Sequence, residues 1–239
     1  MKCIMKMILK APMMTTMRIK SFFSVAVLML FALQAFSQDN RFGLWYNADA
    51  EIKLVRNLKA DLAGSLRTDR NGSNVGSFYL EGGLNYKINK HFSTGAFYRI
   101  IENKEDDGNF YFRHRLYAEI KGKMPVLRFT LSARYRFQEQ TKTYIKDPED
   151  DEPGFYNRFK FEIDYNVPKL PLTPAVYTEF LGETLASNGI LIEKRRTGGS
   201  LTYSISKKHD VAVEYIYLTS KVTNPRYFNV ISLNYSVKF

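Results

Sequence analysis

Charged side chains recur at every second position in the middle of this 239-residue chain, and they are its main candidates for chemistry. Between residues 110 and 121, arginine, glutamate, lysine and tyrosine alternate with phenylalanine, leucine, alanine and isoleucine, and similar alternation returns in 127–138 and 155–165. A period of two places these charges on one face of extended strands. The candidate residues are Arg99, Arg113, Arg115, Glu119, Arg128, Arg134, Arg136, Arg158, Lys160 and Glu162.

Two interpretations of this charged face remain open. One is a basic wall that selects anionic solutes, because rings of charge set the selectivity of pores. The other is a packed network of ion pairs that closes a narrow barrel, since side chains already fill the interior of a barrel of about eight strands. We favour the packed network because long arginine and tyrosine side chains can cross a barrel only slightly wider than that.

Other chemistry finds little support in the sequence. The histidines His91 and His209 fall in expected turns, and the sequence contains no Gly-rich phosphate loop, metal-spaced histidine pair or nucleophile elbow. Two acidic stretches, 102–109 and 139–154, lack the spacing of a calcium loop and are expected to be solvated. We therefore assign no catalytic, cofactor-binding or metal-binding residue and expect the protein not to be an enzyme.

The elements that carry these charges are expected to be long antiparallel strands. Most of them run for about 10–14 residues, whereas strands in soluble domains have about 5–6 and a tilted membrane-spanning strand needs about 9–11. Short and long connections alternate along the chain, as they do in outer-membrane barrels. The expected strands lie near residues 42–54, 58–66, 78–88, 92–100, 110–121, 127–138, 155–165, 175–184, 190–205, 211–220 and 227–239.

These features predict an all-β fold, a transmembrane antiparallel up-and-down β-barrel of 10–12 strands. The pattern yields eleven segments, but bacterial single-chain barrels normally have an even number of strands. An eleven-stranded barrel of this kind would also close through a parallel contact between its first and last strands. We therefore expect twelve strands.

The amino terminus resembles an export signal. Residues 1–20 are basic, residues 21–36 are apolar and uncharged, and Ala35 and Ser37 supply small residues before a cut at Gln38. We expect a cleaved signal peptide at 1–37 and a barrel at 38–239. The only cysteine, Cys3, lies in the leader.

Composition excludes several classes of protein. A charged fraction of 25% and a mean hydropathy of −0.30 do not fit a polytopic helical membrane protein. The net charge of +11 falls to +6 when the leader is removed, because residues 1–37 hold 5 of the 35 basic residues and none of the 24 acidic ones. This mild charge gives no reason to expect nucleic acid as a partner.

The carboxyl terminus alternates up to a final aromatic residue. This pattern resembles the signal that presents the last strand of outer-membrane proteins to the barrel-assembly machinery. We expect that machinery as a partner and the cell outer membrane as the location. The expected signal residues are Ile231, Leu233, Tyr235, Val237 and Phe239.

Several segments of the mature chain resemble domain of unknown function 2490, a family of outer-membrane barrels common in the Gram-negative Bacteroidota. The resemblance lies in residues 42–47 (FGLWYN), 84–90 (LNYKINK), 112–116 (FRHRL) and 156–160 (YNRFK), and in the carboxyl terminus. It implies a barrel and its location, and it brings no established activity, cofactor or catalytic residue.

The expected function is that of a non-enzymatic outer-membrane barrel, either a narrow porin-like pore or a structural or surface barrel. Expected contacts are outer-membrane lipid, lipopolysaccharide and, for a pore, a small anionic solute. The alternative is an outer-membrane enzyme of phospholipase type, which would place histidine and serine on the outer wall. His114 has the outward parity for this role, but the nearby Ser132 has inward parity. A soluble β-sandwich fits the long strands poorly.

Overall fold

The computed structural model describes residues 41–69, 72–105, 107–144, 152–184, 192–221 and 226–239. The expected signal peptide at 1–37 therefore lies outside the described residues, as do most of the acidic residues of the 139–154 stretch. Within the described part of the chain, no helix is long and apolar enough to cross a membrane.

Eleven strands form the described structure, and each coincides with one of the segments expected from the sequence. They vary from 11 residues in β9 to 17 residues in β5. The strands are β1 (Arg41–Val55), β2 (Leu58–Asp69), β3 (Asn74–Lys87), β4 (Phe92–Lys104), β5 (Phe110–Val126), β6 (Phe129–Lys142), β7 (Gly154–Tyr165), β8 (Leu172–Glu183), β9 (Lys194–Ser204), β10 (His209–Ser220) and β11 (Arg226–Lys238).

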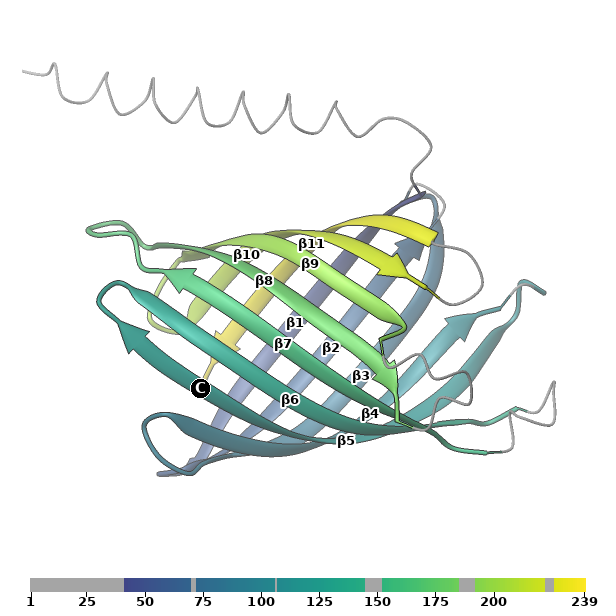
Figure 1. Cartoon of the computed structure of the whole chain (residues 1–239), viewed down its shortest axis with the longest axis horizontal. Coiled ribbons are helices and arrows are strands. Elements are labelled where there is room, and N and C mark those ends of the chain that lie inside the picture. Colours follow the sequence, from purple (N-terminus) through teal and green to yellow (C-terminus); the bar gives the residue numbers. More distant parts are fainter. Residues whose placement is uncertain (1–40, 70–71, 106, 145–151, 185–191, 222–225) are drawn as a thin grey trace, which may run out of the picture. The chain divides into compact units, whose positions relative to one another are not determined.

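The sheet closes on itself as a barrel in which each strand pairs with its neighbours in sequence (Figure 1). Ten of the contacts are antiparallel, and the closing contact between β1 and β11 is parallel, from Arg41 opposite Phe228 to Glu51 opposite Lys238. The expectation of twelve strands was therefore wrong for the described chain. Parallel hydrogen bonding still pairs the backbone groups of both strands, so an odd number leaves no open edge.

Side chains reinforce the parallel closure from inside the barrel. Asn47 of β1 donates its amide hydrogens to Ser232 Oγ at 2.8 Å and to Asn234 Oδ1 at 2.7 Å, both on β11. Ser232 and Val230 are completely buried, and Val230 packs with Trp45 in a small apolar cluster. This parallel seam is therefore among the most tightly packed regions of the described structure.

The two faces of the sheet differ in chemistry. Large apolar side chains are exposed on the outer face of every strand from β2 to β8, for example Leu80, Leu116 and Phe161. Side chains of opposite parity point into the barrel, where Arg99, Arg136 and other charged residues are buried. The period of two thus separates an apolar exterior from a charged interior.

The two ends of the barrel also differ. One end carries the short connections, such as residues 56–57, 127–128 and 205–208, together with the carboxyl terminus, which is marked in Figure 1. The opposite end carries the longer connections between β6 and β7 and between β8 and β9. The charged interior lies between these ends.

Candidate functional site

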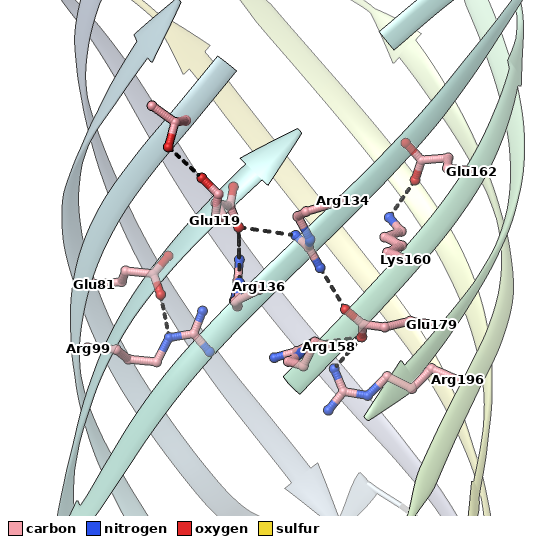
Figure 2. Close-up of polar contacts among 11 residues, drawn as sticks. Glu81, Arg99, Glu119, Arg134, Arg136, Arg158, Lys160, Glu162, Glu179 and Arg196 are labelled. Atoms are coloured by element: carbon pink, nitrogen blue, oxygen red, sulfur yellow. Dashed lines mark hydrogen bonds and ion pairs between the residues drawn. The ribbon is translucent and has the colours of Figure 1, made fainter. Parts of the chain in front are cut away.

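The centre of the interior is crossed by ion pairs that two glutamates hold together, which we call the central network (Figure 2). Glu179 of β8 contacts Arg134 at 2.6 Å, Arg158 at 2.7 Å and Arg196 at 3.4 Å. Glu119 of β5 contacts Arg136 at 2.7 Å and Arg134 at 3.8 Å. The central network comprises Glu119, Arg134, Arg136, Arg158, Glu179 and Arg196.

Burial makes this network sensitive to change. The Glu179 side chain is only 4% exposed, and the Arg158 side chain 7%. Opposite charges at this depth compensate for lost hydration only when their hydrogen bonds are well made, so removing one partner is strongly unfavourable. Arg134 links the two glutamates, and the network therefore ties β5 through β9 together across the interior.

Smaller ion pairs flank the central network. Arg99 of β4 donates to Glu81 of β3 at 2.5 Å, and Lys160 pairs with Glu162 along β7. Their distribution over β3, β4 and β7 extends the charged lining beyond the central network (Figure 2).

A third group of polar contacts lies near the end with the long connections. Arg113 pairs with Glu105, and the Tyr144 hydroxyl lies 2.8 Å from both of these side chains. Burial and the hydrogen bond to Glu105 raise the pKa of Tyr144, which keeps the phenol protonated as a donor. This contact fastens the connection after β4 to the one after β6.

Cations and aromatic rings alternate inside the barrel, and we call this arrangement the cation–ring stack. The Arg67 guanidinium lies 3.9 Å from the centre of the Trp45 ring and 5.0 Å from that of Tyr79. Arg99 lies 3.8 Å from the Tyr79 ring, and Arg196 lies 5.6 Å from the Trp45 ring. The stack therefore runs from β9 through β1, β2 and β3 to β4.

A second aromatic group supports Arg136. Its guanidinium lies 3.8 Å from the Tyr117 ring, which stacks on Phe97 at 4.9 Å. Phe97 in turn covers Gly83 and Gly95, where an added Cβ would come within 2.1 and 2.6 Å of the ring. The two glycines thus allow an aromatic side chain to lie flat against the inner wall.

Near the end with the short turns, the interior widens into a cavity of about 350 Å³. Asp49, Glu51 and Asp61 line one side of this cavity, and Lys121 and Arg136 line another. The interior therefore has an acidic wall on β1 and β2, and its basic groups concentrate elsewhere.

Most residues expected at the charged face lie inside the barrel in the described structure. Arg128 differs: it lies exposed in the turn between β5 and β6, because Leu127 adopts a positive φ of 57° and β6 begins only at Phe129. Arg196 was not expected, because β9 has weak alternation. Glu179 points into the barrel, but the sequence gives no sign that it joins three arginines.

The histidines have ordinary partners. The Tyr98 hydroxyl lies 2.5 Å from His114 Nδ1 on the outer face, and the Tyr235 hydroxyl lies 2.7 Å from His209 Nδ1. The cross-strand neighbours of His114 are Ile100 and Thr141, so the phospholipase alternative gains no support here. Among the described residues, no group of three or more metal-binding side chains gathers.

The residues expected to form the assembly signal belong to β11 and its end. Leu233 and Tyr235 are exposed on the outer face, and Phe239 extends just beyond the strand. The Phe239 backbone nitrogen donates to the Glu51 carbonyl oxygen at 2.9 Å. The terminal residue is therefore hydrogen-bonded across the parallel seam.

Comparisons with known proteins bear on the fold and the family. The structure resembles that of the NanC porin, with a TM-score of 0.52 and 17% identity over 83% of this chain and 98% of that one. The beta domain of the Bordetella autotransporter BrkA is also similar, with a TM-score of 0.47 and 10% identity over 71% of this chain and 78% of that one. No curated protein matches the sequence. Residues 42–229 match the model of the family described as "Protein of unknown function (DUF2490)", and the chain therefore belongs to that family.

Proposed function

We propose that this protein is a non-enzymatic barrel of the outer membrane whose interior forms a narrow, charged pore. The observation that carries the proposal is the contrast between the two faces of one closed sheet. Its exterior is apolar around the barrel, and its interior is crossed by the central network. An apolar exterior of this kind has no use in a water-soluble protein, whereas a wall that faces lipid requires it.

The outer face supports insertion into lipid. Leu62, Leu80, Leu116, Phe161 and Val176 are all more than half exposed, and they lie on five different strands. Transfer of such side chains from water to hydrocarbon is favourable. The closed sheet also pairs the backbone N–H and C=O groups of its strands, to which an apolar bilayer offers no hydrogen bonds.

Export and assembly form part of the same proposal. The leader at 1–37 directs the chain across the inner membrane, and the alternating carboxyl terminus up to Phe239 presents it to the barrel-assembly machinery. The partners are then outer-membrane lipid and lipopolysaccharide. Cell fractionation tests the location: we expect a heat-modifiable band in the outer membrane with Gln38 as its first residue, and recovery in the soluble periplasm would reject it.

The charge of the interior supports a preference for small anions. Arginines outnumber glutamates in the central network and the cation–ring stack, and an excess of fixed positive charge favours anions in a narrow pore. The arginines are Arg67, Arg99, Arg134, Arg136, Arg158 and Arg196, and the glutamates that pair with them are Glu81, Glu119 and Glu179.

A structural barrel without transport, closed by the packed network that we favoured from the sequence, is the second candidate, because the central network spans five strands. The cavity of about 350 Å³ beside that network is the reason to place the pore first. Planar-bilayer recordings separate the two. A pore gives small conductance steps in the wild type, with a reversal potential that favours chloride over potassium. A barrel that conducts only after the double change Glu119→Ala and Arg136→Ala is structural, since that change removes both ion pairs of Glu119 without altering the net charge.

A further inference from the structure

Two arginines inside the barrel have no carboxylate partner among the described residues. Arg67 of β2 lies between the rings of Trp45 and Tyr79, and its Nε atom is buried without a hydrogen bond. Arg115 of β5 donates from Nη2 to Gln140 Oε1 at 2.5 Å and from Nε to the same oxygen at 3.2 Å. Rings and a neutral amide leave both positive charges uncompensated, which is unfavourable in a partly desolvated interior.

Arg196 of β9 brings a third guanidinium to the same region. Arg67 and Arg196 lie within 6 Å of the same indole ring, that of Trp45. Arg196 has the longest of the three contacts with Glu179, at 3.4 Å, and its Nε atom is also buried without a hydrogen bond. Its charge is therefore only partly neutralised.

Strand register connects Arg115 to this pair. Arg115 is the cross-strand neighbour of Arg99 on β4. The Arg99 guanidinium lies 3.8 Å from the Tyr79 ring, and that of Arg67 lies 5.0 Å from the same ring. Arg67, Arg115 and Arg196 belong to β2, β5 and β9, so the three charges come from different walls of the barrel. Positive charge therefore converges inside the barrel beyond what the glutamates there compensate.

We propose that Arg67, Arg115 and Arg196 form a binding site for a small oxyanion that carries a carboxylate or phosphate group. Guanidinium groups bind such oxygens through paired, charge-assisted hydrogen bonds. Each guanidinium carries five N–H donors, and the Trp45 and Tyr79 rings supply an apolar wall beside them. The site depends on the proposed function only because solutes must reach the interior.

Trp45 makes the site observable without any measurement of transport. It is the only tryptophan of the chain, and two of the three proposed ligand residues lie against its ring. The refolded barrel in detergent micelles is titrated separately with inorganic phosphate and with acetate, at an ionic strength held constant with sodium chloride. We expect a saturable change in Trp45 emission with at least one of the two anions and none with sodium chloride alone.

Variants identify the residues responsible. Arg115→Gln, which leaves the surroundings of Trp45 unaltered, should weaken the apparent affinity about tenfold or more, as expected for the loss of a charge-assisted hydrogen bond. Arg67→Gln should have a similar effect. Lys59→Gln is the matched control, because Lys59 pairs with Glu51 near the short-turn end and is 40% exposed, and it should bind as the wild type does.

The outcomes are distinct. A saturable response to phosphate alone assigns the site to phosphate groups, a response to acetate alone assigns it to carboxylates, and a response to both assigns it to small oxyanions in general. If the refolded barrel remains heat-modifiable and Trp45 emission does not respond to either anion, the proposed site is wrong. An affinity that is unaltered in Arg115→Gln also overturns it. Conductance without a response rejects only this site, whereas a response without conductance rejects only the pore.

Discussion

The positions of Leu62 and Ala63 on β2 make a matched test of which face meets lipid. Leu62 points outward, is 52% exposed and lies close to the middle of its 12-residue strand. Ala63 points inward, with Asp49 and Glu81 as its cross-strand neighbours, and it lines the interior cavity of about 350 Å³. The two positions are adjacent in sequence and opposite in chemistry.

Arginine at these positions should have very different effects. Leu62→Arg places a charge against hydrocarbon, which costs about 2–4 kcal/mol near the middle of a membrane barrel. That lowers the folding equilibrium constant about 30-fold or more. Ala63→Arg adds a cation between two carboxylates where there is space for it, so we expect the free energy of folding to change by no more than about 1 kcal/mol.

The assay is folding into phospholipid vesicles at increasing urea, followed by the heat-modifiable band on a gel. Leu62→Met, which conserves volume and apolar character, should fold as the wild type does. If Ala63→Arg proves more harmful than Leu62→Arg, the strand has the opposite register, because a shift of one residue exchanges its faces. Equal tolerance of both arginines would show that β2 does not contact lipid.

Three further predictions concern assembly, the central network and the inner wall. Replacing Tyr235 and Phe239 together by Asp should sharply reduce assembled protein in the outer membrane without affecting secretion, as measured by fractionation, and normal assembly would show that the terminal pattern is not a signal. Glu179→Gln should lower the free energy of unfolding by about 3–5 kcal/mol, because it leaves buried arginines without their shared carboxylate; a urea midpoint equal to that of the wild type would contradict this. Gly83→Ala should lower the free energy of unfolding by about 1–3 kcal/mol, because the added methyl group overlaps the Phe97 ring and the neighbouring backbone. If adding Phe97→Ala to this variant restores none of the lost stability, the strain lies elsewhere.

The strands could be predicted from the sequence because each has two different surroundings. An apolar exterior and a charged interior force a period of two, which gave all eleven segments of the described barrel. Boundaries were less certain where the pattern weakens. The ninth segment was expected from residue 190, but β9 begins at Lys194. Arg128 was misplaced because the turn residue Leu127 carries an apolar side chain that continues the alternation of β6.

The closure of the barrel and its ion pairs could not be predicted in the same way. The even-number rule excluded a parallel seam, yet Asn47 and Ser232 stabilise one through side-chain hydrogen bonds. The alternation along a strand predicts which charged side chains point into the barrel, but it does not predict which of them form ion pairs with one another. Arg134 and Glu179 are 45 residues apart and on strands that are not neighbours, so their contact depends on how the strands tilt around the closed sheet.

The most direct test of a lipid-facing exterior and a water-facing interior is the reactivity of single cysteines in isolated outer membranes. The chain is suited to it, because its only cysteine is Cys3, within the signal peptide expected at residues 1–37. Cysteine replaces one residue at a time in adjacent pairs on three strands, and a small, charged thiosulfonate reagent measures the accessibility of each. The inward positions Ala63, Asn85 and Ser236 line the interior cavity, and the outward positions are Leu62, Leu84 and Val237.

We predict rapid modification at the three inward positions and protection at the three outward ones until detergent dissolves the membrane. Uniform modification of all six before detergent is added would contradict insertion of the barrel into a bilayer. Modification of the outward set alone would contradict the orientation of the strands.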